Sequence, residues 1–270
     1  MLWKSRLIAI VLSFAFGAMA CSQNEAGNIH PEFDISAGAL SRFLTGLPDD
    51  LQENIRERPA VFLEFLKAAL RAPLELIALV DKSHPVDAAY VPADLKKLSN
   101  YGLKLSRNDL ALRAIVLPDI LAMDELAKQE GITLVFSSAY RSYEYQKGVY
   151  NRHVEMYGEE IADRESAQPG KSQHQLGTTV DFGSITDEYA DTPAGRWLFN
   201  HAWRFGFSLS YPDGYEHLTG YRHEIWHYRY IGRDLARFER EFFNSIQHYL
   251  LTFLHTHRVE LMSKFVAGGK

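Results

Sequence analysis

Two short motifs place metal-binding and proton-transferring side chains in the second half of this 270-residue chain. The first, Ser-Gln-His-Gln-Leu-Gly-Thr-Thr-Val-Asp, contains His174 and Asp181, and the second, Glu-Ile-Trp-His, contains Glu224 and His227. Two imidazoles and one carboxylate form a donor set that catalytic zinc accepts, with water in the remaining position. A spare carboxylate can handle the protons of that water. The chain must therefore fold so that two separate segments meet at one ion.

The first motif predicts a loop that leads into a strand. Gly170 and Gly177 lie on either side of His174, and glycines at such positions indicate irregular backbone. Residues 178–182 have the apolar and β-branched character of a strand. Because side chains alternate along a strand, Asp181 is expected to face away from the core that its two neighbours enter. A loop histidine and a strand aspartate can then converge on one ion.

The second motif predicts the start of another strand, over residues 226–231. Glu224 lies three residues before His227, so on an ideal strand the two side chains would face opposite ways. A bulge, or a strand that begins only at Ile225, would let Glu224 turn toward the metal. His223 is the alternative ligand in this motif, and it would point away from the face that His227 uses.

The composition favours a folded protein with a sizeable core. Hydrophobic residues make up 46% of the chain and aromatic residues 13%, which argues against a disordered chain. The formal net charge is −5, whereas proteins that bind nucleic acid through phosphate contacts carry an excess of basic residues. We therefore expect no nucleic-acid partner.

The N-terminus has the pattern of an exported protein. A short basic region precedes an apolar run over residues 7–16, which is too short for an ordinary spanning helix. Small residues then lead to Cys21, the only cysteine, in a pattern like a bacterial lipobox, although Ala18 stands where leucine is usual. We predict a signal peptide over residues 1–20, a tether over residues 21–35 and a lipid anchor at Cys21 that holds the protein to a membrane of the cell envelope. A soluble secreted protein and a retained N-terminal anchor are the alternatives.

Apolar periodicity divides the rest of the chain into three regions. Residues 36–80 and 233–270 repeat apolar side chains at three- and four-residue steps, which predicts an N-terminal helical region and a C-terminal helical extension. Residues 81–232 mix strand-like and helical segments and hold both motifs, so we expect them to form the metal-binding catalytic domain. Within it, a helix is predicted over residues 107–128, with a kink at Pro118. The predicted strands are 132–136, 178–182, 207–211 and 226–231.

Taken together and in this order, the motifs resemble the VanY-like D-alanyl-D-alanine carboxypeptidases. That family belongs to a wider zinc group with the lysostaphin-type peptidases and the hedgehog signalling domain. Its pattern Ser-x-His-x-x-Gly-x-Ala-x-Asp aligns with residues 172–181, and its Glu-x-Trp-His aligns with residues 224–227. A Tyr-Arg-Ser segment of the family aligns with residues 140–142. The resemblance covers residues 80–232, and the combination of motifs is specific.

The resemblance implies a zinc site and a role for each residue in it. The implied site combines the zinc ligands His174, Asp181 and His227, the base Glu224, and the substrate-contact residues Arg141, Ser172 and Gln146. Arg141 would hold the terminal carboxylate of the substrate, which suits a guanidinium because it can bond a carboxylate through two N–H groups. A surface salt bridge is the alternative role for Arg141.

The resemblance also implies an α+β fold, in which a small antiparallel sheet carries the zinc site and is flanked by helices, with helical additions at both ends. Thr179 stands where the family usually has alanine, and Ile225 stands where many members have proline. Neither departure removes a ligand. Thr179 could narrow the pocket, so it leaves the substrate preference open.

The predicted function is that of a zinc-dependent D,D-carboxypeptidase, which removes a terminal D-alanine from peptidoglycan stem peptides. An L,D-carboxypeptidase or a peptidoglycan endopeptidase would use the same chemistry. A non-catalytic zinc-binding module is a more distant alternative, and the retained Glu224 and Arg141 argue against it. A metal-free hydrolase with Asp181 and Glu224 as a carboxylate pair is a further alternative. It would survive chelation, whereas the predicted enzyme would not.

Overall fold

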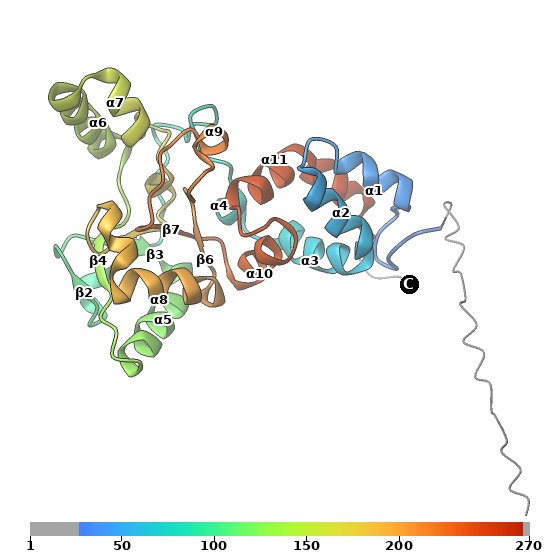
Figure 1. Ribbon diagram of the computed structural model, residues 1–270, viewed down its shortest axis with the longest axis horizontal. Coiled ribbons are helices and arrows are strands. Elements are labelled where there is room, and N and C mark those ends of the chain that lie inside the picture. Colours follow the sequence, from blue (N-terminus) through green and yellow to red (C-terminus); the bar gives the residue numbers. More distant parts are fainter. Residues whose placement is uncertain (1–26, 267–270) are drawn as a thin grey trace, which may run out of the picture.

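The computed structural model describes residues 27–266 and shows two lobes, one helical and one built on a sheet (Figure 1). The predicted signal peptide and the anchor at Cys21 lie outside the described residues. Among the helices of residues 27–266, none combines the length and the apolar character that crossing a bilayer requires. The helical lobe is made of α1 (Ala37–Phe43), α2 (Asp49–Glu57), α3 (Pro59–Arg71), α10 (Arg233–Phe242) and α11 (Gln247–Lys264).

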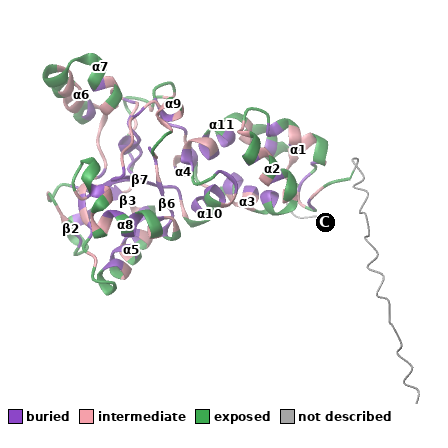
Figure 2. Cartoon of the chain, in the orientation of Figure 1, coloured by how far each residue is buried: buried purple, intermediate pink, exposed green. Residues whose placement is uncertain are grey.

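The helical lobe has one core, to which both ends of the described chain contribute. Buried side chains from residues 33–79 pack against buried side chains from residues 231–261. Figure 2 marks the buried residues along the helices of this lobe in purple. Phe62 of α3 lies at the centre, with its ring centroid 5.2 Å from that of Phe238 and 5.7 Å from that of Phe253. The predicted N-terminal helices and C-terminal extension are therefore one structural unit.

The sheet lobe is built on five strands in the order β2–β4–β5–β7–β6. Three pairs are antiparallel, namely β4–β5, β5–β7 and β7–β6, and the edge pair β2–β4 is parallel. The predicted α+β fold, with a small sheet flanked by helices, is confirmed, and the parallel edge pair is an addition to it. The strands are β2 (Lys104–Leu105), β4 (Val135–Ser138), β5 (Thr179–Phe182), β6 (Phe207–Leu209) and β7 (His227–Tyr230), beside a two-stranded ribbon of β1 (Leu95–Lys97) and β3 (Ala111–Arg113).

Helices surround this sheet unequally. Side chains of α5 (Leu117–Gln129) and α8 (Pro193–His201) share a buried core with those of β4, β5, β6 and β7. In contrast, α6 (Tyr143–Tyr157) and α7 (Glu159–Glu165) form a hairpin that projects at the upper left of Figure 1. The short helices α4 (Leu74–Ile77) and α9 (Glu216–Thr219) complete the fold.

The predicted helix over residues 107–128 is wrong over residues 107–116. Residues 111–113 form β3, residues 114–116 form a 3₁₀ turn, and the helix begins only at Leu117. Pro118 then lies in the first helical turn, where its missing N–H would have no partner in any case, and so it starts the helix rather than kinking it.

Candidate metal centre

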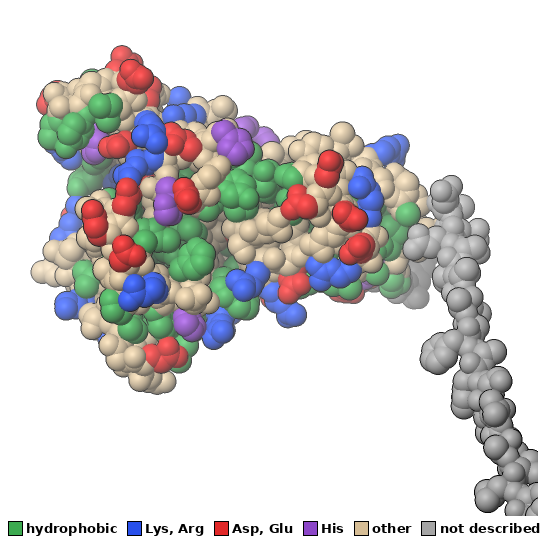
Figure 3. All heavy atoms as spheres, in the orientation of Figure 1, with side chains coloured by type: hydrophobic (Ala, Val, Ile, Leu, Met, Phe, Trp, Pro, Cys, Tyr) green, Lys and Arg blue, Asp and Glu red, His purple; other side chains and the backbone are tan. Residues whose placement is uncertain are grey.

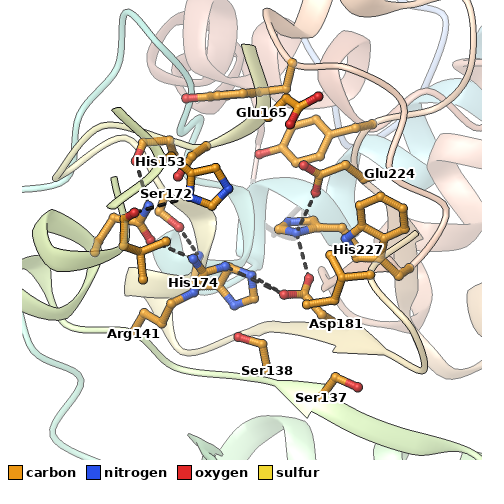
Figure 4. Close-up of a pocket in the computed structure, with 18 of the residues that line it drawn as sticks. Ser137, Ser138, Arg141, His153, Glu165, Ser172, His174, Asp181, Glu224 and His227 are labelled. Carbon is orange, nitrogen blue, oxygen red and sulfur yellow. Dashed lines mark hydrogen bonds and ion pairs between the residues drawn. The ribbon is translucent and has the colours of Figure 1, made fainter. Parts of the chain in front are cut away.

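The three predicted metal ligands meet at the centre of the sheet. β5 and β7 pair so that Asp181 lies directly opposite His227. His174 comes from a 3₁₀ turn, Gln173–Leu176, which precedes β5 and ends at Gly177 with a left-handed φ of 71°. One donor atom from each ligand lies within 4.8 Å of the others. Figure 4 shows His174 and His227 on either side of Asp181. The sequence-distant segments therefore converge as the motifs predicted.

Asp181 lies between the two imidazoles. Its Oδ2 is 3.1 Å from His174 Nε2, and its Oδ1 is 3.0 Å from His227 Nδ1. His174 is 0% exposed, Asp181 3% and His227 4%. Because these side chains are buried and line the pocket, any further partner of their donor atoms must bind inside it.

The hydrogen bonding of His174 leaves a lone pair directed at the centre. Its Nδ1 lies 2.7 Å from the carbonyl oxygen of Ala139, which can only accept, so Nδ1 carries the proton. Nε2 is then unprotonated. Within residues 27–266, neither this Nε2 nor Asp181 Oδ1 makes a hydrogen bond of normal geometry. Two nitrogens and a carboxylate oxygen fit a zinc ion, and bound zinc would satisfy both of these buried atoms.

The electrostatics keep His174 and Asp181 in their metal-binding protonation states. Burial lowers the pKa of His174 to about 4, with a further contribution from the charge of Arg141, so the imidazole is neutral near pH ~7. Burial alone would raise the pKa of Asp181, but His174 and His227 outweigh it and hold that pKa well below the usual range. A neutral imidazole and an ionised carboxylate are the forms that bind metal.

Glu224 reaches the site from a turn. The backbone N–H of His227 donates to the carbonyl of Glu224 at 3.1 Å, and β7 begins only at His227. Glu224 is therefore freed from the strand alternation, and its Oε2 lies 3.5 Å from His227 Nδ1. Burial, together with repulsion from Asp181, raises the pKa of Glu224 to about 8. His223, the alternative ligand, lines a separate surface depression with Arg222.

Arg141 lies on the wall of the same pocket and is held by Gln146. Its Nη1 donates to Gln146 Oε1 at 2.8 Å, and Gln146 Nε2 donates to the carbonyl of Ala167. Its Nη2 lies 3.6 Å from Asp181 Oδ2. The observed contact of Ser172 is with backbone, since its Oγ accepts the N–H of His174 at 3.3 Å. Substrate contacts by Gln146 and Ser172 remain predictions.

The pocket above the ligands has a volume of about 280 Å³, and some of its walls were not predicted. It is also lined by His153, Arg107 and Glu165, which lie outside the sequence motifs. On the face seen in Figure 3, acidic, basic and histidine side chains gather below the projecting α6–α7 hairpin. The spacing of Gln146, Val149 and His153 along α6 puts them on one helical face and could have indicated this wall.

Comparison with known proteins gives relatives for most of the sheet lobe. A family model described as VanY, D-alanyl-D-alanine carboxypeptidase, matches residues 109–233. The chain is 31% identical over 175 residues to YodJ of Bacillus subtilis, and 31% identical over 169 residues to a D-alanyl-D-alanine carboxypeptidase of Enterococcus faecalis. These alignments cover 62% and 59% of this chain, and 64% and 60% of the relatives. The chain thus spans less than two thirds of the length of these relatives.

Two solved structures share the fold. The LdcB LD-carboxypeptidase is 29% identical, with a TM-score of 0.60, over 67% of this chain and 86% of that protein. A vancomycin-resistance D,D-pentapeptidase VanY, solved in complex with Zn(II), is 28% identical, with a TM-score of 0.56, over 66% of this chain and 99% of that protein. Both likenesses support the α+β assignment made from the strands and helices.

Removal of the central carboxylate should abolish tight metal binding. Mutation of a residue that only hydrogen-bonds to a metal ligand lowers metal affinity ~10–100-fold. We expect Asp181→Asn to lower zinc affinity by more than this, because it removes a ligand. Metal content after dialysis against a zinc buffer measures this. His153→Gln is the matched control, since His153 lines the same pocket outside the ligand group and its replacement should leave the zinc content unchanged. An Asp181→Asn protein that keeps its full zinc content would contradict the assignment.

Proposed function

We propose that the protein is a zinc-dependent carboxypeptidase of the VanY family, whose model, described as D-alanyl-D-alanine carboxypeptidase, matches residues 109–233. Its proposed reaction is the removal of a terminal D-alanine from peptidoglycan stem peptides. The observation that carries this proposal is the buried group of His174, Asp181 and His227 on the floor of a pocket that also holds Glu224 and Arg141.

Zinc, when bound by His174, Asp181 and His227, supplies a Lewis acid for the scissile carbonyl and for the attacking water. Glu224 moves the protons: its carboxylate takes one from the water and returns it to the leaving amine. The burial and the Asp181 charge that raise the pKa of Glu224 make it a stronger base than an exposed glutamate. Asp181 and Glu224 therefore have different proposed roles, one as ligand and one as base.

Arg141 is the proposed sensor of the free chain end. A guanidinium can bind a carboxylate through two parallel N–H bonds, and Gln146 Oε1 holds this one by accepting a hydrogen bond from Nη1. Arg141 Nε is buried and has no hydrogen-bond partner among residues 27–266. Such a group discriminates against internal peptide bonds, because these bring no negative charge to it.

The proposed reaction can be tested on defined stem peptides. We expect the purified protein to release D-alanine from a stem that ends in D-Ala-D-Ala, to lose this activity with a chelator, and to regain it with zinc. Mass spectrometry of the products measures the cleavage. Release from stems that end in a single D-alanine would favour the L,D-carboxypeptidase, which the likeness to LdcB keeps as the second candidate. Cleavage of crosslinked stems would favour an endopeptidase, and activity that resists chelation would favour the metal-free carboxylate pair.

A variant of the base is the control for this assay. Glu224→Gln should keep its zinc and lose about 10²–10⁴-fold in kcat, the usual contribution of general acid–base catalysis. Full activity of Glu224→Gln would show that Glu224 is not the base, and it would not contradict the zinc site.

Arg141→Ala tests recognition of the chain end. We expect kcat/KM on substrates with a free carboxylate to fall about 10–100-fold, because a hydrogen bond to a charged group contributes about 1.5–3 kcal/mol. The same peptide with an amidated end should be a poor substrate for both proteins. Arg107→Ala, at the pocket edge, is the control. Equal impairment on free and amidated ends would show that Arg141 is not the sensor.

We also propose that the protein is exported and held at the cell envelope by a lipid at Cys21. The basic and apolar pattern of residues 1–20 and the extracytoplasmic position of peptidoglycan support this. Labelling of cells with an alkyne fatty acid should mark the wild-type protein and not Cys21→Ser. An unlabelled wild-type protein in the culture medium would favour the soluble secreted form.

A further inference from the structure

A buried path of amide and hydroxyl groups connects the metal centre to the C-terminal extension. His227 Nε2 lies 3.4 Å from Gln173 Oε1, and Gln173 Nε2 donates to Gln247 Oε1 at 3.2 Å. Gln247 is the first residue of α11, outside the segment that the family model matches. His227, Gln173 and Gln247 are 4%, 5% and 1% exposed. The path therefore runs through the interior, from the sheet lobe to the helical lobe.

One fixed acceptor sets the direction of the hydrogen bonds along this path. The backbone carbonyl of Ser208 can only accept, so the Gln247 group that lies 3.4 Å from it is the Nε2 amide nitrogen. Gln247 Oε1 then faces Gln173, which must present its own Nε2. Gln173 Oε1 is left facing His227, and a carbonyl oxygen cannot donate. A proton on His227 Nε2 would complete this chain of hydrogen bonds and leave Nδ1 free to bind a metal.

Ser210 makes the alternative amide orientations unfavourable. Its hydroxyl donates to Gln173 Oε1 at 2.7 Å and accepts from Gln247 Nε2 at 3.3 Å. Ser210 is 2% exposed, so no bulk water can replace a lost partner. A flip of either glutamine amide would bring donor against donor or acceptor against acceptor, and it would leave buried polar groups unpaired.

We propose that Gln247 and Gln173 are positioning residues, which fix the tautomer and orientation of His227 so that Nδ1 faces the metal. Nδ1 is the atom that lies 3.0 Å from Asp181 Oδ1 and 3.5 Å from Glu224 Oε2. A ligating imidazole usually donates its other ring N–H to a hydrogen-bond acceptor, and such an acceptor raises the metal affinity. The inference rests on the proposed zinc site, and it gives the C-terminal extension a role in metal binding.

Zinc affinity, measured by competition with a chromophoric chelator, tests the path. Gln247→Met keeps the approximate volume and removes the amide, and we expect it to weaken zinc binding ~10–100-fold. Gln173→Met should have a similar effect. The double variant should lose no more than the larger single loss, because both residues act on His227 through one path. Wild-type affinity in Gln247→Met, or losses that add in the double variant, would overturn the proposal.

A core variant on the same helix separates positioning from general stability. Leu250 is 0% exposed in the apolar core of the helical lobe. Leu250→Ala should lower the Tm and leave the zinc affinity of the folded protein unchanged. If Leu250→Ala weakens zinc binding as much as Gln247→Met does, the effect is one of lobe stability and the proposal fails.

A second measurement uses the unaltered protein. Nitrogen NMR of histidine-labelled, zinc-loaded protein should show the proton of His227 on Nε2, with the signal assigned by its loss in His227→Gln. A proton on Nδ1 would overturn the inference, whether or not the variants fold. A wild-type protein that binds no zinc would instead overturn the proposed zinc site, and with it the role of the path in metal binding.

Discussion

The antiparallel register of β5 and β7 is the constraint on which the site depends. It places Asp181 opposite His227 on one face of the sheet. On the other face, Val180, Phe182 and Tyr228 enter the core of the sheet lobe. Since side chains alternate along a strand, a slip of one residue would bury Asp181 in that core and turn Phe182 toward the pocket. Apolar packing on the far face thus holds two ligands in place on the near one.

The same burial separates the two carboxylates chemically. Asp181 lies between the imidazoles of His174 and His227, which hold its pKa below the usual range. Glu224 does not lie between two imidazoles, and burial together with the neighbouring Asp181 charge raises its pKa to about 8. Two acidic groups whose surroundings drive their pKa values apart are suited to different tasks. The difference arises from position, because Asp181 lies between His174 and His227, whereas the turn leaves Glu224 beside His227 alone.

Local pattern was enough to predict the ligands, and it failed where tertiary packing decides. Asp181 follows from strand alternation, and the expectation that Glu224 precedes its strand is confirmed by the turn that ends at His227. The predicted position of Pro118, in the middle of a helix, is wrong, because the residues before it continue the helical pattern across the true start of α5. Nothing in the sequence around Gln247 indicated a role at the metal centre. A glutamine at the start of a helix is ordinary, and only the packing of α11 against Ser208 and Gln173 makes it part of the site.

The boundary of the family-matched segment is not a boundary of the structure. Three polar contacts join the matched segment to residues outside it. Arg229 of β7, fully buried, donates to the carbonyl of Glu75 at 3.1 Å, and Ser208 of β6 donates to Glu239 of α10 at 2.8 Å. The third contact joins Gln173 to Gln247. Separation of the lobes would expose these groups or leave them unpaired, and burial has already raised the pKa of Glu239 to about 8. The helical lobe therefore acts as part of the wall behind the metal centre, even though its residues lie at the two ends of the described chain.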